Sequence, residues 1–180
     1  EYQKLLKSND QDLKYEKAMV YYEKGDYMRA GTLFGGLIGI YRGTEKSETS
    51  HYIYADCLYN MKDYITAKHY FSTFVQNYPT SDLAEEAQFM SAYCSYEMSP
   101  NPRLDQTETY NALDGFQLFI NLYPQSEKAK EATTLMDELR DKLVYKAYLN
   151  ATLYYNLGNY MGNNYQSAVI AARNTLDDYP

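Results

Sequence analysis

The chain has 180 residues, and its 45% hydrophobic content is sufficient for one domain with a sizeable core or for a stack of small repeated units. A formal net charge of −7, with no basic cluster along the sequence, makes nucleic acid and anionic membrane surfaces poor partners. No apolar run approaches the roughly 20 residues that span a bilayer, and the 23 tyrosines indicate packed helices with a surface suited to partners.

The first repeated unit, roughly residues 11–43, is predicted to contain two helices joined by a tight turn. Residues 18–30, AMVYYEKGDYMRA, superpose on residues 55–67, ADCLYNMKDYITA, at a shift of 37 residues. Gly25 in the first of these turns can adopt a positive φ, which suits a sharp reversal after a helix. The sequence therefore predicts a repeating unit of helix, short turn and helix.

The second and third units, roughly residues 47–80 and 82–125, end in the same phrase. FSTFVQNYP at residues 71–79 and FQLFINLYP at residues 116–124 place aromatic side chains three and four residues apart, which is one stripe of a helix. The proline ends each helix because it cannot donate the next hydrogen bond. Between the two phrases, MSPNPRLDQTET at residues 98–109 predicts an enlarged turn.

The fourth unit, roughly residues 126–180, begins with a stretch that contains no proline or glycine before residue 158. Its periodicity through Leu135, Leu139 and Leu143 predicts one long helix, roughly residues 126–157, between the third and fourth repeats. All four units together predict an all-α fold in a single domain of residues 1–180. The period of about 34–37 residues and the recurring Ala, Tyr, Phe and Pro positions indicate an α-solenoid of tetratricopeptide repeats.

No motif in the chain indicates catalysis, a metal or a cofactor. His51 and His69 have no cysteine or carboxylate at metal-ligand spacing, and no phosphate-binding glycine loop or nucleophile elbow occurs. We therefore expect no enzyme activity and no cofactor. Cys57 and Cys94 occupy equivalent positions 37 residues apart, which favours two buried thiols over a disulfide or a redox pair.

An aromatic ladder is predicted on the first helices of the first three units. Three pairs of aromatic side chains, seven residues apart within each pair, recur at the 37-residue shift, so each pair lies on one face of its helix. In stacked repeats the first helices line the concave surface. Tyrosine is costly to bury without a hydroxyl partner, so the set favours a peptide-binding groove, although any single ring could equally serve packing. The predicted groove comprises Tyr15, Met19, Tyr22, Tyr52, Asp56, Tyr59, Asn60, Phe89, Tyr93 and Tyr96.

The order of these features resembles the BamD family, the periplasmic lipoproteins of the outer-membrane β-barrel assembly machinery. The resemblance rests on four helix pairs, Tyr-Pro helix ends, the enlarged third turn, the long helix and the opening EYQKLLKSNDQDLKYEKA, which is most similar to versions from the Bacteroidetes. It covers essentially the whole chain. It implies a non-catalytic scaffold at the periplasmic face of the outer membrane, held there by a lipid anchor that this chain lacks. Because it also implies a fifth repeat after Pro180, we expect the chain to be a fragment.

Two partners are implied by the resemblance. The N-terminal repeats would recognise C-terminal targeting segments of unfolded outer-membrane proteins, and the C-terminal repeats would dock on the periplasmic domains of the barrel-forming BamA. Arg173 is the nearest counterpart of the family's basic docking residue, and a solvated arginine near a helix C-terminus is an equal alternative. Two other hypotheses are a different tetratricopeptide adaptor for a folded periplasmic or cytosolic partner, and an accessory domain of an enzyme whose catalytic part follows Pro180.

Overall fold

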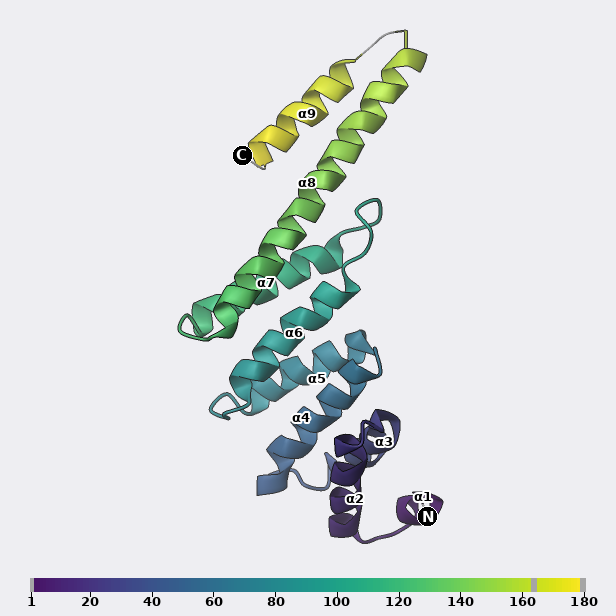
Figure 1. Cartoon of the computed structure of the whole chain (residues 1–180), viewed down its shortest axis with the longest axis vertical. Coiled ribbons are helices and arrows are strands. Elements are labelled where there is room, and N and C mark those ends of the chain that lie inside the picture. The colour runs from purple at the N-terminus through teal and green to yellow at the C-terminus, as the bar shows by residue number, and fades with distance from the viewer. Residues whose placement is uncertain (1, 163–164, 179–180) are drawn as a thin grey trace.

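The computed structural model describes residues 2–162 and 165–178, and every regular element within them is a helix (Figure 1). Successive helices from α2 to α9 pack as neighbours, so the chain rises in one direction as a stack of helix pairs. This arrangement confirms the predicted all-α, tetratricopeptide-like solenoid. The helices of the described residues are α1 (Tyr2–Leu6), α2 (Gln11–Glu23), α3 (Tyr27–Leu37), α4 (Glu45–Asn60), α5 (Tyr64–Asn77), α6 (Ala84–Met98), α7 (Thr107–Leu122), α8 (Lys128–Tyr160) and α9 (Gln166–Asp178).

The turns inside the first two pairs share one geometry. Gly25 has a φ of 75°, and the carboxylate of Asp26 then accepts a hydrogen bond from a backbone N–H of the first turn of α3. In the second pair Lys62 stands at the glycine position with a φ of 64°, and Asp63 caps α5 in the same way. A left-handed conformation costs a non-glycine residue about 1–3 kcal/mol. The aspartate cap and the helix packing therefore hold the turn even where glycine is absent.

The second helix of each of the first three pairs buries the stripe that the repeated phrase predicts. An alanine, a phenylalanine and a further large apolar residue follow one another at spacings of four and three, and each is at most 1% exposed. Burying a side chain of phenylalanine size contributes about 1.5–3 kcal/mol to folding. The buried stripe consists of Ala30, Phe34, Leu37, Ala67, Phe71, Phe74, Ala112, Phe116 and Phe119.

Cys57 and Cys94 are free and fully buried, which confirms the expectation of two structural thiols. Burial raises the pKa of both thiols to about 12. Because the thiolate is the reactive form, neither cysteine is a nucleophile near neutral pH. Both serve as small apolar side chains in the core.

The predicted enlarged turn lies between Met98 at the end of α6 and Thr107 at the start of α7, and Gln106 organises it from inside. This side chain is 3% exposed, and its amide donates hydrogen bonds to the carbonyls of Asn101 and Leu104 at 2.9 and 3.1 Å. Its own carbonyl accepts a hydrogen bond of 2.7 Å from the Thr109 hydroxyl. A single buried amide thus satisfies two carbonyls of the turn, and the ammonium of Lys146 on α8 donates to the carbonyls of Pro102 and Leu104 from the other side.

The predicted long helix is α8, which continues unbroken over 33 residues, about 50 Å at 1.5 Å per residue. Its first half packs on α7 and its second half on α9 (Figure 1). It starts and ends two to three residues later than predicted, because the Ser126 hydroxyl first closes a turn by accepting from the N–H of Lys128, and because Gly162, with a φ of 67°, follows its end.

Part of the predicted fourth unit lies outside the described residues. Residues 163–164, between α8 and α9, and residues 179–180, at the end of that unit, are not among them. Within the described part of the unit, Ala168 on α9 is 9% exposed and faces α8.

Candidate functional site

The predicted groove residues divide into two rows, and the inner row lies in the cores of the helix pairs. The Tyr15 ring on α2 stands edge-on to the Phe34 ring on α3, with 5.7 Å between centroids. These rings therefore join the first helix to the second helix within each pair, which is the packing alternative left open by the sequence. The same contact recurs at 5.8 Å between Tyr52 and Phe71 and at 5.6 Å between Phe89 and Phe116.

Phe89 shows the consequence for ligand binding most clearly. It is 3% exposed, so a peptide on the surface has almost none of its ring to contact. Tyr15 and Tyr52 are partly exposed. The inner row therefore lies beneath the candidate site and does not form its main contact surface.

The outer row begins with a hydrogen-bonded group between the first and second helix pairs. The hydroxyl of Tyr22 donates to Oδ2 of Asp56 on α4 at 2.6 Å, and the amide of Asn60 donates to the same oxygen at 3.0 Å. Burial raises the pKa of the Asp56 carboxyl above its usual range, and the Tyr22 hydrogen bond opposes the rise. Burial and the nearby carboxylate also raise the pKa of Tyr22, so its proton stays on the phenol. Met19, predicted beside this group, packs on the first core cluster.

A series of neighbouring tyrosine rings continues the outer row from α4 onto α6. The Tyr59 ring lies 6.1 Å from the Tyr93 ring, which in turn lies 5.4 Å from the Tyr96 ring at an interplanar angle of 30°. The hydroxyl of Tyr96 ends the row by donating a hydrogen bond of 2.6 Å to Glu138 on α8, which raises the pKa of Tyr96 to about 12. All three tyrosines are partly exposed. The structure thus brings the outer residues of the predicted groove together across α2, α4 and α6.

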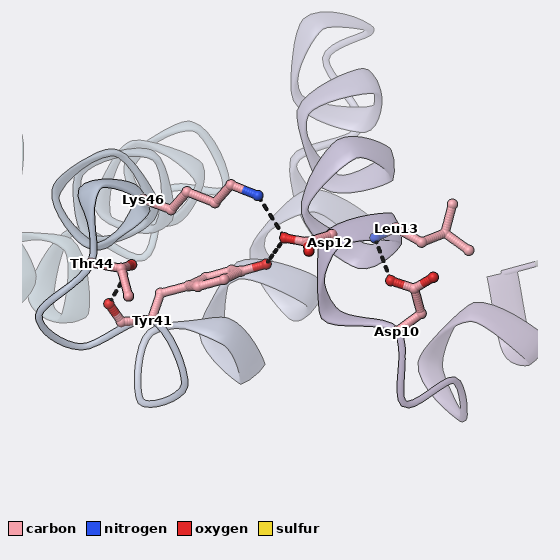
Figure 2. Close-up of polar contacts among 6 residues, drawn as sticks. All are labelled: Asp10, Asp12, Leu13, Tyr41, Thr44 and Lys46. Atoms are coloured by element: carbon pink, nitrogen blue, oxygen red, sulfur yellow. Dashed lines mark hydrogen bonds and ion pairs between the residues drawn. The ribbon is translucent and has the colours of Figure 1, made fainter.

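A lysine at the start of the second pair fixes the first junction between pairs, and sequence reasoning missed it. The ammonium of Lys46 lies 2.6 Å from Oδ1 of Asp12 on α2 and 4.9 Å from the ring centroid of Tyr15. The hydroxyl of Tyr41 donates to the same carboxylate oxygen at 3.1 Å (Figure 2). Lys46 and Tyr41 together hold the pKa of Asp12 below its usual range.

The third junction repeats this arrangement, whereas the second does not. Lys128 lies 4.7 Å from the Phe89 centroid and 2.6 Å from Oε1 of Glu86. Leu83 occupies the equivalent position at the second junction and packs in a core cluster. The three positions are equivalent because the turn before each contains the same backbone hydrogen bond. Its N–H donors and carbonyl acceptors are Thr44 and Tyr41, Ser81 and Tyr78, and Ser126 and Tyr123. In the sequence, the signal for these junction residues is their position two residues after the Thr or Ser of each turn.

Arg173 lies exposed on α9, and the structure does not bring it near the outer row, which is built on α2, α4 and α6. It is the single charged residue between residues 147 and 176 of the sequence. A hollow of about 530 Å³ lies between α8 and α9, with Tyr148, Tyr155 and Val169 among its walls. The large apolar side chains exposed on the second half of α8, its end and α9 are Val144, Tyr145, Tyr148, Leu153, Tyr154, Tyr155, Leu157, Tyr160, Met161, Val169, Ile170 and Leu176.

Within residues 2–162 and 165–178, no group of three or more His, Cys, Asp or Glu residues is placed to hold a metal ion. Over the same residues, none of the helices combines the length and the apolar character required to cross a membrane.

Comparison with known proteins identifies the family. No curated protein matches the chain. The family model YfiO, described as outer membrane lipoprotein, matches residues 7–180, which include α2 to α9 and hence both the outer row and the α8–α9 surface. The chain therefore belongs to the YfiO family, the BamD family of outer membrane lipoproteins that take part in outer-membrane protein assembly.

Proposed function

We propose that the chain is a non-catalytic scaffold of outer-membrane protein assembly, with a peptide-binding face on α2, α4 and α6 and a docking face on α8 and α9. The first face would hold targeting segments of unfolded outer-membrane proteins, and the second would contact the periplasmic domains of BamA. The proposed location is the periplasmic face of the outer membrane, with attachment through a lipid anchor. Family membership supports the general role, and the two surfaces support this division of labour.

The observation that carries the peptide-binding proposal is the continuous outer row. Tyr22, Tyr59 and Tyr96 recur at the 37-residue shift, and each reaches a side chain on the first helix of the next pair. Ring faces of this kind bind the side chains of an extended peptide, while Asp56 and Asn60 offer hydrogen-bonding groups to its backbone. The row thus combines aromatic contact area with polar groups at the spacing of successive repeats.

Replacing Tyr59 with alanine tests the peptide face, because this ring stands in the middle of the row. We expect Tyr59→Ala to weaken binding of a synthetic C-terminal peptide of an outer-membrane protein by about 1–3 kcal/mol, as for an aromatic anchor. Tyr154→Ala, on the exposed second half of α8, is the matched control and should bind normally. Titration calorimetry measures the affinities, and thermal melting verifies that each variant folds.

Unchanged peptide affinity in a folded Tyr59→Ala variant would assign the row to packing alone. If the wild-type chain binds no such peptide at all, the remaining hypothesis is a tetratricopeptide adaptor for a folded partner.

The docking face is supported by the density of exposed apolar side chains beside a single cation. Large exposed apolar areas on a folded chain indicate protein interaction sites. Arg173 lies on this surface, where a carboxylate of a partner would meet no competing charge within α9 before Asp177. The charge would set orientation and association rate more than total affinity.

Reversing the charge of Arg173 tests the docking face. We expect Arg173→Glu to lower affinity for the BamA periplasmic domains by more than about 1 kcal/mol, with a smaller loss at high salt because screening weakens like-charge repulsion. Lys130→Glu, an exposed position on the first half of α8, carries the same charge change and should bind BamA normally. Surface plasmon resonance at two ionic strengths gives both affinities. Equal affinities of the two variants would remove Arg173 from the contact.

A further inference from the structure

A groove lies between α1 and α2, on the side of α2 that faces away from the ladder. Its second wall is lined by Leu13, Lys17, Val20 and Tyr21 of α2 and by Lys24, the residue that ends the helix. Leu13, Lys17, Val20 and Lys24 follow at spacings of four, three and four residues, which places them on one face. Lys17 follows Tyr15 by two residues and is therefore turned about 200° from it around the helix. The groove has a volume of about 420 Å³, within the range of about 300–1,000 Å³ that is typical of small-molecule sites.

The groove combines an apolar floor with a basic rim. Leu13 and Val20 are each 39% exposed, so the floor is open to solvent. The three lysines of the rim form no ion pair with any described residue. A chain with a net charge of −7 thus gathers three unpaired lysines along one groove. The basic and aliphatic side chains that line the groove are Lys4, Leu5, Leu13, Lys17, Val20 and Lys24.

We propose that this groove binds an anionic phospholipid of the membrane surface at which the family's lipoproteins reside. The lysine ammonium groups neutralise the lipid phosphate, and the acyl chain covers Leu5, Leu13 and Val20. Lysine suits this task because its methylene stem lies along apolar surface while its ammonium stays at the polar boundary. Cations near an anionic leaflet are attracted within about a Debye length, so the contact holds the N-terminal helix pair close to the lipid.

A lipid fits these observations better than the carboxylate end of a peptide. A targeting peptide on the outer row would lie on the opposite face of α2, away from the lysines of the groove, and a carboxylate alone would leave the exposed apolar floor uncovered. Lys4 and Leu5 of α1 line the groove, and Figure 1 shows α1 at the N-terminal end of the stack. The net charge of −7 is a sum over the whole chain and does not describe this groove. Here Lys4, Lys17 and Lys24, which are 13 and seven residues apart in sequence, line one site.

The experiment measures binding of the chain to vesicles by co-flotation. We compare vesicles of phosphatidylethanolamine with about a third phosphatidylglycerol against vesicles of neutral phosphatidylcholine. The test variant is Lys17→Gln with Lys24→Gln, and the matched control is Lys62→Gln with Lys130→Gln. Each double variant removes two positive charges and changes the net charge from −7 to −9. We expect the test variant to bind the anionic vesicles about 25-fold more weakly, since each of the two lysines near the surface contributes about fivefold, and the control to bind like the wild type.

A second variant tests the apolar floor, and soluble probes distinguish the source of the phosphate. Leu13→Ser with Val20→Ser keeps every charge and should also bind the anionic vesicles several-fold more weakly. Inorganic phosphate at equal ionic strength should not compete, because it lacks an acyl chain. Circular dichroism verifies that all variants are helical.

Several results would overturn the proposal. These are no preference of the wild type for anionic vesicles, an equal loss in both lysine variants, full competition by inorganic phosphate, or groove-dependent binding of a peptide carboxylate without lipid binding. None of the substitutions touches the outer row, so peptide affinity reports separately on the proposed function.

Discussion

Tyrosine has different environments in two regions of the molecule. Between α2 and α7, four tyrosine hydroxyls form hydrogen bonds with side chains distant in sequence, whereas the tyrosines on the second half of α8 expose their rings. The same residue type therefore serves packing between repeats in one region and forms free surface in the other. The hydroxyls with distant partners are those of Tyr22, Tyr41, Tyr78 and Tyr96. The exposed rings of α8 are those of Tyr145, Tyr148, Tyr154, Tyr155 and Tyr160.

The boundary between the two regions runs through the middle of a single helix. In the first half of α8, Ala132, Met136, Leu139 and Leu143 form a stripe that is at most 4% exposed against α7 and α6. In the second half only Gly158 is buried among the described residues, because α9 is the one described helix packed there and the turn between α6 and α7 contacts only its beginning, through Lys146. The second half of α8 is helical although most of it is exposed, so its helix formation does not depend on burial. How much of each half is buried depends on the helices that pack against it.

The largest expected effect comes from shortening a leucine in each half of α8. Leu139→Ala should lower the free energy of unfolding by about 2–4 kcal/mol, because it removes methyl groups from a fully buried site and leaves a cavity. Leu153, 56% exposed, should tolerate the same change within about 0.5 kcal/mol. Urea denaturation followed by circular dichroism measures both. Similar losses at the two positions would show that the second half is also packed.

Removing one hydroxyl in each region should give the next largest effect. Tyr22→Phe is expected to cost about 1–3 kcal/mol at neutral pH, because the Asp56 carboxylate loses its shortest hydrogen bond in a partly buried place. Tyr154→Phe should be close to neutral, since its hydroxyl forms no hydrogen bond with a described residue. Thermal unfolding of the pair distinguishes the regions. A neutral Tyr22→Phe would mean that solvent replaces the lost donor.

The smallest effect concerns pH and Asp56, whose pKa is raised in the folded chain from its ordinary value of 3.8. A raised pKa means that the folded state binds this proton more tightly than the unfolded state does. The stability that the Asp56 carboxyl contributes to the wild type is therefore fully present below pH 3.8. It is lost as the pH rises through the pKa of this carboxyl in the folded chain. Asp56→Asn abolishes that loss, so its stability relative to wild type should rise between about pH 3 and pH 7. A relative stability that falls with pH would reverse the assigned direction, and Asp177→Asn on exposed α9 serves as the pH control.

The helix pairs were predictable because their signals are local. Phe71 and Phe74 share a stripe with Pro79 closing the helix, and the absence of proline and glycine before residue 158 predicted α8 with an error of three residues at most. The candidate site was predictable only in part. Tyr15 and Tyr22 are two turns apart on one face, yet the first packs on Phe34 and the second reaches the next pair.

The sequence by itself determined the repeat period, the turn positions and the helical stripes, since these depend on backbone hydrogen bonds and side chains within about four residues of each other. Tertiary structure decided which rings are buried and where α1 and α2 gather Lys4 beside Lys17. It also decided that Lys46 and Lys128 close the first and third junctions, whereas Leu83 packs in the core at the second. Those outcomes depend on neighbours tens of residues away. Burial and Coulomb attraction act through space, and only the stacking of the helix pairs sets the distances over which they act.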